Sequence, residues 1–252
     1  MQLRGLAAAT YSDPRIFLYT MDLSTSLLHL QARRQLQNFD AQELVDWAVA
    51  ALVAGYETEH LVMLAGMDRD SREEKEAYFE RAVQELSIPL PAADDSTLRA
   101  YASHLAQAGA QGTIGYRDAL NQLLEIYRLL DYEPRYLRLF ELGEDLLSMD
   151  AGYPSFYSAQ LSPENAEQIV RETFAHFLAG EALGIDPWQP GWVYCFACGA
   201  VGAPTVKRDW LARLHLLPGK EVCATCGSDR IAYFTDDMRR GDILEDMVTQ
   251  RK

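Results

Sequence analysis

Apolar side chains recur every three or four residues through most of the first 180 positions, the spacing of amphipathic helices. Between residues 40 and 180 this pattern predicts seven helices, which begin near Asp40, Thr58, Ser71, Asp95, Tyr116, Pro134 and Glu164. Ser71 with Glu74, and Asp40 with Glu43, have the spacing of a capping box. The connections are short, which favours antiparallel neighbours. We therefore expect a compact helical array, and no fixed internal repeat is visible in it.

Some details of this array are specific enough to check. The helix from Thr58 should bury Val62 together with Leu61 and Leu64, and Lys75 in the next helix should face water. Gly109 and Gly112 are expected to break the helix that begins at Asp95. Residues 1–39 are the least determined: residues 15–20 could form a short strand, whereas the leucines after Ser24 favour a helix.

The C-terminal residues follow a different pattern. Residues 192–194 and 230–235 are rich in β-branched and aromatic side chains, so two short strands are expected there. All four cysteines lie between these strands as two pairs, Cys195 with Cys198 and Cys223 with Cys226. Each pair has two intervening residues and a following glycine, which suits a tight turn that presents two thiolates to one ion. Two such turns complete the tetrahedral four-sulfur site that structural zinc accepts.

Other uses of the cysteines fit less well. Disulfides are disfavoured in a reducing compartment, and a redox pair needs a preceding βαβ unit that the pattern lacks. Iron is an alternative metal in a zinc-poor host. His215 is a possible substitute ligand, although four thiolates already fill the site. We therefore predict one structural Zn²⁺ on Cys195, Cys198, Cys223 and Cys226.

These motifs resemble zinc ribbons over residues 191–235, because a strand rather than a helix follows the second pair. The insert at residues 207–217 is long for a hairpin and could hold a helical turn. Zinc ribbons bind nucleic acid, dock proteins or only stabilise a fold, so the resemblance implies a metal and no particular activity. The fold class expected for the chain is mainly α, a compact helical array followed by a small C-terminal β zinc ribbon.

The helical part carries a second, less specific resemblance. Residues 44–48, with Gly55, Tyr56 and residues 64–66, are similar to the opening of small, mostly uncharacterised bacterial proteins, some of them described as immunity-like. Residues 98–142, with Gly112, Ile114 and Tyr127, fit the same pattern. The likeness extends over residues 40–180 and involves core residues and turn glycines. It implies a fold, and brings no catalytic residues with it.

Charge separates the same two parts. Residues 1–190 hold 29 acidic and 14 basic residues, whereas residues 191–252 hold eight acidic and nine basic ones. Two prolines and two glycines fall in residues 184–191, where a helix cannot continue. Trp188 and Trp192 in this stretch suggest a packed junction. We predict an acidic all-α domain at residues 1–187, and a zinc-ribbon module at 188–252 that ends in a short tail or helix.

Catalytic motifs are not found in the chain. Glu57 and His60 have the spacing of a helical di-iron motif, but no second copy exists, and Glu172 with His176 has ordinary helix-face spacing. The 29 acidic residues of the first part are most simply solvated helix faces. The expected function is non-enzymatic: docking of a protein partner with a basic surface, through the acidic helices.

Two other function classes stay open. One is an enzyme whose site the motifs do not reveal. The other is nucleic-acid binding by the ribbon, with a basic patch and two stacking rings, namely Lys207, Arg208, Arg213, Lys220, Arg230, Trp210 and Tyr233. The overall charge of −14 repels phosphate backbones, so only weak nucleic-acid binding is expected. No apolar run is long enough to span a membrane and no leader pattern is present, so a cytoplasmic location is expected.

Overall fold

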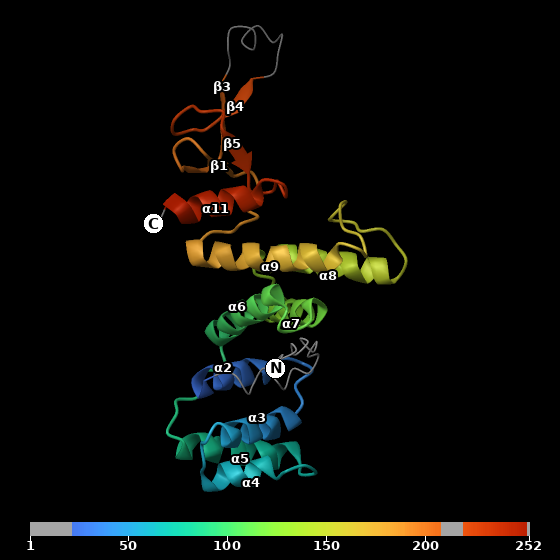
Figure 1. Cartoon of the computed structure of the whole chain (residues 1–252), viewed down its shortest axis with the longest axis vertical. Helices are drawn as coiled ribbons and strands as arrows, with labels where there is room; N and C mark the ends of the chain where they lie inside the picture. Colours follow the sequence, from blue (N-terminus) through green and yellow to red (C-terminus); the bar gives the residue numbers. More distant parts are fainter. Residues whose placement is uncertain (1–21, 208–218, 251–252) are drawn as a thin grey trace, which may run out of the picture. The chain divides into compact units, whose positions relative to one another are not determined.

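The computed structural model of the chain describes residues 22–207 and 219–250 (Figure 1). The residues group into two compact units, Met1–Phe156 and Tyr157–Lys252, called here the N-terminal and the C-terminal unit. In the ranges described, the N-terminal unit is helical, and the C-terminal unit adds two small sheets to its helices. This confirms the predicted fold class, mainly α with β elements near the C-terminus.

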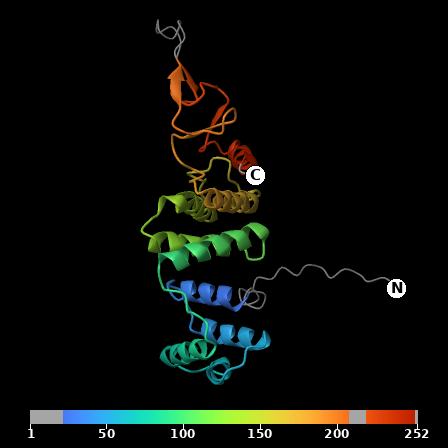
Figure 2. The same ribbon diagram turned by 90° about the vertical axis from the view of Figure 1, so that its left-hand side faces the viewer.

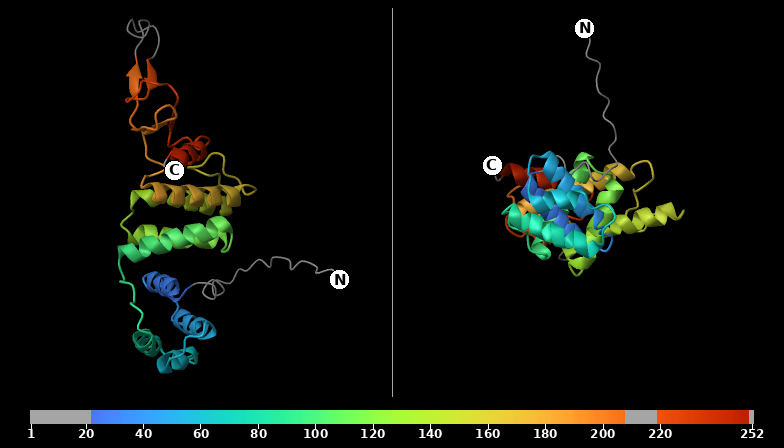
Figure 3. Two further views of the ribbon diagram at one scale, coloured as in Figure 1. Left: turned by 60° about the vertical axis from the view of Figure 1, so that its left-hand side comes forward. Right: turned by 90° about the horizontal axis from the view of Figure 1, so that it is seen from below.

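The N-terminal unit is built from successive helices with short connections. They are α2 (Leu23–Arg33), α3 (Gln42–Val53), α4 (Glu59–Ala65), α5 (Arg72–Glu85), α6 (Asp95–Gln111), α7 (Tyr116–Leu129), the 3₁₀ turn η1 (Pro134–Tyr136) and α8 (Leu137–Asp150). The two green helices α6 and α7 lie side by side (Figures 1 and 2, and Figure 3, left). Helix α2 contacts both α3 and α6, and so joins the helices on either side of it.

Helices α2 to α5 enclose one apolar core around Trp47 of α3. The Trp47 ring is 1% exposed and meets Phe79 of α5 edge-on, with centroids 5.2 Å apart. Its indole N–H donates to Ser26 Oγ on α2 at 3.1 Å, which satisfies the one polar group of the buried ring. Three helices are thus fixed by one side chain.

Helices α6, α7 and α8 pack at short range. Leu105, Leu123 and Leu142, one from each helix, are buried. A Cβ atom at Gly143 of α8 would lie 2.5 Å from Leu124 Cδ1 of α7. The glycine is therefore required for the close approach of α7 and α8.

The C-terminal unit begins with α9 (Ala166–Leu183) and ends with α11 (Arg240–Gln250). Between them lie five short strands, β1 (Val193–Cys195), β2 (Val201–Gly202), β3 (Thr205–Lys207), β4 (Lys220–Val222) and β5 (Ile231–Tyr233). Strand β1 is central in an antiparallel sheet of order β2-β1-β5, with Tyr194 opposite Ala232. Strands β3 and β4 form a separate antiparallel pair in which Lys207 lies opposite Lys220.

Helix α11 lies between α9 and the three-stranded sheet (Figure 1). Their shared core contains Leu183 of α9, Tyr194 of β1, Phe234 after β5 and Ile243 of α11. The Tyr194 hydroxyl donates to Asp246 Oδ2 on α11 at 2.5 Å. The sheet that carries Cys195 is thereby packed on a helix of its own unit.

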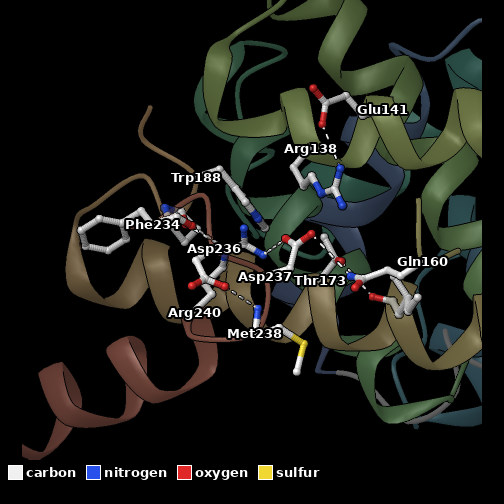
Figure 4. Close-up of polar contacts among 12 residues, drawn as sticks. Arg138, Glu141, Gln160, Thr173, Trp188, Phe234, Asp236, Asp237, Met238 and Arg240 are labelled. Carbon is white, nitrogen blue, oxygen red and sulfur yellow. Dashed lines mark hydrogen bonds and ion pairs between the residues drawn. The ribbon is translucent and has the colours of Figure 1, made fainter. Parts of the chain in front are cut away.

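Arg240, the first residue of α11, is 5% exposed and connects three segments (Figure 4). Its Nε donates to the carbonyl oxygens of Pro187 at 3.1 Å and Phe234 at 3.0 Å. Its Nη1 lies 2.7 Å from Asp237 Oδ1, and its guanidinium carbon lies 5.6 Å from the centroid of the Trp188 ring. The chain after α9, the end of β5 and the start of α11 are therefore held by one buried cation.

Several predicted details agree with the structure. The Ser71–Glu74 capping box is present at α5, with both of its hydrogen bonds. Helices also begin after Thr58 and at Tyr116, as predicted, and Gly112 ends α6 with φ of 73°. The described chain after residue 240 is helical, one of the two alternatives expected for it.

Other details were wrong. Val62 is 48% exposed, because α4 is a single short helix that buries only Leu61 and Leu64. Lys75 is 6% exposed rather than in water, and its Nζ donates to Gln42 Oε1 at 3.0 Å. Gly109 lies inside α6 and does not break it.

The division into units differs from the boundary that composition suggests at residue 187. Helix α9 groups with the cysteine-bearing sheet, because Leu183 shares a core with Tyr194 and Ile243. A Cβ atom at Gly180 would lie 2.6 Å from Pro187 Cδ, so the chain after α9 folds back closely on that helix. The predicted strand at residues 15–20, and the predicted turn within residues 208–217, lie outside the described residues.

Candidate metal centre

The four cysteines lie on two turns that have the same backbone hydrogen bonds. In the first turn, the N–H of Gly199 donates to the carbonyl of Cys195 at 2.8 Å, and the N–H of Cys195 donates to Ala200. In the second, Gly227 donates to Cys223 at 2.9 Å, and Cys223 donates to Ser228. Both glycines adopt the left-handed conformation, with φ of 70° and 71°. This conformation is the physical reason for the glycine after each pair.

The two turns bring all four sulfur atoms together. Cys195 Sγ lies 3.6 Å from Cys226 Sγ, and Cys198 Sγ lies 3.7 Å from Cys223 Sγ. All four sulfurs lie within 4.8 Å of one another, and none is in a disulfide. A tetrahedron of Zn–S bonds of about 2.3 Å has edges of about 3.8 Å. These two sulfur–sulfur distances match that edge, and the set needs only a small contraction to hold one metal ion.

The chemistry of the sulfur cluster also fits a dication. Backbone N–H groups of Cys226 and Thr225 point at Cys223 and lower the pKa of its thiol to about 6. The Ala200 N–H likewise lowers the pKa of the Cys198 thiol. The contacts of Cys198 with the neighbouring sulfurs have a larger, opposite effect and raise its pKa to about 12. A bound divalent metal would stabilise all four sulfurs as thiolates.

The site has a buried and an exposed side. Cys195 and Cys223, the first residue of each pair, are buried, whereas Cys198 and Cys226 are exposed. Strands β1 and β4 run directly into the first cysteine of each turn, so the sheets fix the buried pair. Gly199 also faces α11, where its Cα lies against the end of the Gln250 side chain. The cysteine spacing gave no indication of this neighbour, because Gln250 is 51 positions away.

Other residues singled out in the sequence do not form a second site. Within residues 22–207 and 219–250, the cysteine cluster is the one group of three or more His, Cys, Asp or Glu residues suited to a metal. His60 contacts Glu85 of α5, and its backbone N–H donates to the same carboxylate at 3.0 Å. His60 thus lies in the first turn of α4, whereas Glu57 precedes the N-cap Thr58 and is outside the helix. His215 lies outside the described residues.

The residues of the predicted basic patch are only partly placed. Lys207 and Lys220 are cross-strand neighbours, but Lys220 forms an ion pair with Asp229. The hydroxyl of Tyr233 donates to Glu221 Oε2 at 2.6 Å. Arg208, Trp210 and Arg213 lie outside the described residues. The described part of this surface carries three cations, Lys207, Lys220 and Arg230, against the two carboxylates of Glu221 and Asp229.

Comparison of the chain with protein-family models, with curated proteins and with solved structures gives no significant match. Among the helices that the structure describes, none is both long and apolar enough to cross a membrane.

Proposed function

We propose that residues 191–235 form a zinc ribbon in which Cys195, Cys198, Cys223 and Cys226 hold one structural Zn²⁺. The observation that carries the proposal is the convergence of four thiols from two identical turns. Four thiolates complete a tetrahedral site and leave no open position for water or substrate, as in structural rather than catalytic zinc sites. Iron, which accepts the same ligands, is the alternative metal.

The zinc supports the fold of the C-terminal unit. The strands that carry the cysteines are two or three residues long, and few side chains are buried between them. A segment of about 45 residues lacks enough core to fold unaided. Free energy of zinc binding then becomes free energy of folding for the sheet and for the helix α11 packed on it.

Metal analysis and chelation of the full chain test this part of the proposal. Native mass spectrometry after zinc-replete expression should find one zinc per chain, and none in Cys195→Ser/Cys223→Ser. Removal of the metal should increase amide exchange in β1, β5 and α11 while α3 and α5 keep their protection. A stoichiometry well below one, or equal protection with and without metal, would refute a structural zinc.

We further propose a non-enzymatic role for the N-terminal unit, the docking of a protein partner with a basic surface. Residues 1–156 hold 24 acidic and 13 basic residues. Many of these cations already have carboxylate partners: Arg33, Arg34, Arg72, Arg99, Arg117, Arg135 and Arg138. The excess of carboxylates is therefore displayed to solvent, where it attracts cationic surfaces and is screened by salt.

Charge reversal on one helix tests the docking role. Glu73 and Glu80 are exposed on α5, and Glu245 is exposed on α11. A partner that co-purifies with the chain at low salt should be lost with Glu73→Lys/Glu80→Lys and kept with Glu245→Lys. Retention of every partner by the α5 variant would contradict docking through this part of the acidic unit.

Nucleic-acid binding by the ribbon is the alternative, and it makes a separate prediction. Because Asp229 and Glu221 lie beside Lys220 and Tyr233, we expect only weak, non-specific binding of about 10⁻⁴ to 10⁻⁶ M at physiological salt. Fluorescence anisotropy with a labelled single-stranded oligonucleotide measures this directly. Binding near 10⁻⁸ M, lost in Lys207→Glu/Lys220→Glu, would favour the alternative.

A further inference from the structure

Two histidines of the N-terminal unit meet between α2 and α6. Nε2 of His29 lies in direct contact with Nδ1 of His104, although the residues are 75 positions apart. Their ring centroids are 4.7 Å apart, and the edge of the Tyr101 ring meets His29 at 4.9 Å. His29 is 4% exposed, whereas His104 is half-buried. The pair thus forms a largely buried contact between helix α2, which belongs to the α2–α5 core, and helix α6 of the α6–α8 helices.

Polar and charged groups surround the pair on every helix that packs there. Asp22, the N-cap of α2, favours the protonated form of both imidazoles. One turn beyond His29, Arg33 makes two hydrogen bonds to Glu43 of α3, at 2.9 and 2.7 Å. Gln122 Oε1 on α7 accepts from Tyr101 at 2.6 Å and from Arg33 at 3.4 Å, and Glu125 lies on the same helix. These residues and the two histidines form what is called here the polar layer.

The contact between the rings depends on their protons. A neutral imidazole has one N–H and one lone pair, so two neutral rings share one proton between Nε2 and Nδ1. A first added proton preserves this hydrogen bond but places a charge inside the layer. A second places an N–H on each side of the contact, and the two cations then repel one another. Full protonation is therefore incompatible with the closed pair.

We propose that His29 and His104 form an acid-sensitive clasp, which holds α6 against α2 at neutral pH and releases it on acidification. Opening at this place separates the α2–α5 core from the α6–α8 helices along the polar layer. The polar layer is suited to such opening, because its separated surfaces are hydrogen-bonding groups that water can satisfy. The inference concerns the N-terminal unit and does not depend on the zinc proposal.

The direction of the pH effect follows from proton linkage. Burial lowers the pKa of His29 to about 3, with a further contribution from His104, and burial also lowers the pKa of His104. In the open state both imidazoles return towards about 6.5. The open state thus binds more protons below pH 6.5, so the clasp is stable above that pH and weakens as the pH falls. Between pH 7 and pH 5, His29 alone shifts the balance towards opening by about 25-fold.

Amide hydrogen exchange measured by mass spectrometry between pH 7.5 and 5 tests the clasp in the full-length protein. After correction for the intrinsic pH dependence of exchange, opening of α2 and α6 should rise at least about 25-fold by pH 5 relative to α4 and α5. His29→Gln retains a donor and an acceptor for His104 but does not titrate, so it should remove the contribution of His29 to this rise. His176→Gln removes a histidine of the C-terminal unit, away from both the polar layer and the reference helices, and should leave the rise unchanged.

Two results would overturn the inference. One is equal acid sensitivity of α2, α6, α4 and α5 in the natural sequence. The other is an unchanged acid response in His29→Gln/His104→Gln. Should these variants fail to fold, NMR titration of the imidazole C–H resonances in the unmodified chain decides the question, since a His29 signal that titrates near pH 6.5 in the folded protein contradicts the clasp.

Discussion

Replacement of Arg240 by alanine should destabilise the C-terminal unit more than any nearby surface change. The guanidinium donates to the carbonyls of Pro187 and Phe234, pairs with Asp237 and covers the ring of Trp188. Its removal leaves two inward-facing carbonyls and a carboxylate without their cation. Breaking one partner of a buried, hydrogen-bonded charge pair costs about 3–5 kcal/mol. The contributions of the individual contacts overlap, so we expect a total loss of about 3–5 kcal/mol rather than the sum of their separate costs.

Arg239 provides a matched control one position earlier. Its guanidinium also lies over an aromatic ring, Phe196 at 5.1 Å, and its Nε lies 3.6 Å from Asp242 Oδ2. The side chain is 47% exposed, however, so solvent screens both interactions. Arg239→Ala should therefore cost less than about 1 kcal/mol.

Urea unfolding of the full-length protein measures both variants. Three of the four tryptophans, Trp188, Trp192 and Trp210, belong to the C-terminal unit, so tryptophan fluorescence reports mainly on it. Arg240→Lys keeps the charge without the planar group that reaches both carbonyls, and an intermediate loss is expected. Costs for Arg240→Ala and Arg239→Ala within about 0.5 kcal/mol of each other would refute the role assigned to the buried cation.

Three further predictions concern local packing. Gly143→Ala should destabilise the N-terminal unit by about 1–3 kcal/mol in thermal unfolding, because its Cβ would displace Leu124. Gly66→Ala is the control: the added Cβ makes only ordinary contacts and the φ angle is negative, so this change should be neutral or stabilising by up to about 1 kcal/mol. Gly227→Ala should weaken zinc affinity, measured in competition with a chelator, because alanine is strained at a φ of 71° even though the space around the added Cβ is open. Gly199→Ala should weaken the affinity more, because the Gln250 side chain must also move. Lys75→Ala should cost about 1–3 kcal/mol in urea because the Gln42 and Asp68 oxygens lose their donor, whereas the exposed Arg81→Ala should change stability by less than about 1 kcal/mol. Equal effects within any of these pairs would contradict the packing described for it.

The features that could be predicted from the sequence are those set by neighbours along the chain. Ser71 and Glu74 are three positions apart, and the geometry of one helical turn is enough to bring them together. The same holds for each cysteine pair, since the turn between Cys195 and Cys198 is closed by its own backbone. The approach of the two turns to each other was predicted from metal chemistry, because a tetrahedral zinc site needs four ligands and each turn supplies two thiolates.

The features that were missed depend on partners far along the chain. Lys75 is buried because Gln42 Oε1 and the carbonyl oxygen of Asp68 accept hydrogen bonds from its ammonium group, and no local pattern reveals these partners. Gly109 stays helical because its interior penalty of about 1 kcal/mol is smaller than the packing of α6 on its neighbours. Arg240 resembles a surface residue at the start of a helix until Pro187, 53 positions earlier, is placed beside it.

The antiparallel pair β3 and β4 lies between the two cysteine turns, so an insertion between these strands lengthens the chain without changing either turn. Lys207, the last residue of β3, lies opposite Lys220, the first residue of β4, and the second cysteine turn begins at Cys223, directly after β4. Each doubling of a flexible connection costs only about 0.6 kcal/mol of closure entropy, compared with about 10–16 kcal/mol for structural zinc binding. Insertions between β3 and β4 can therefore accumulate, or be engineered as tags and binding peptides, with little effect on the affinity of the centre. The module can serve as a rigid base on which a variable loop evolves.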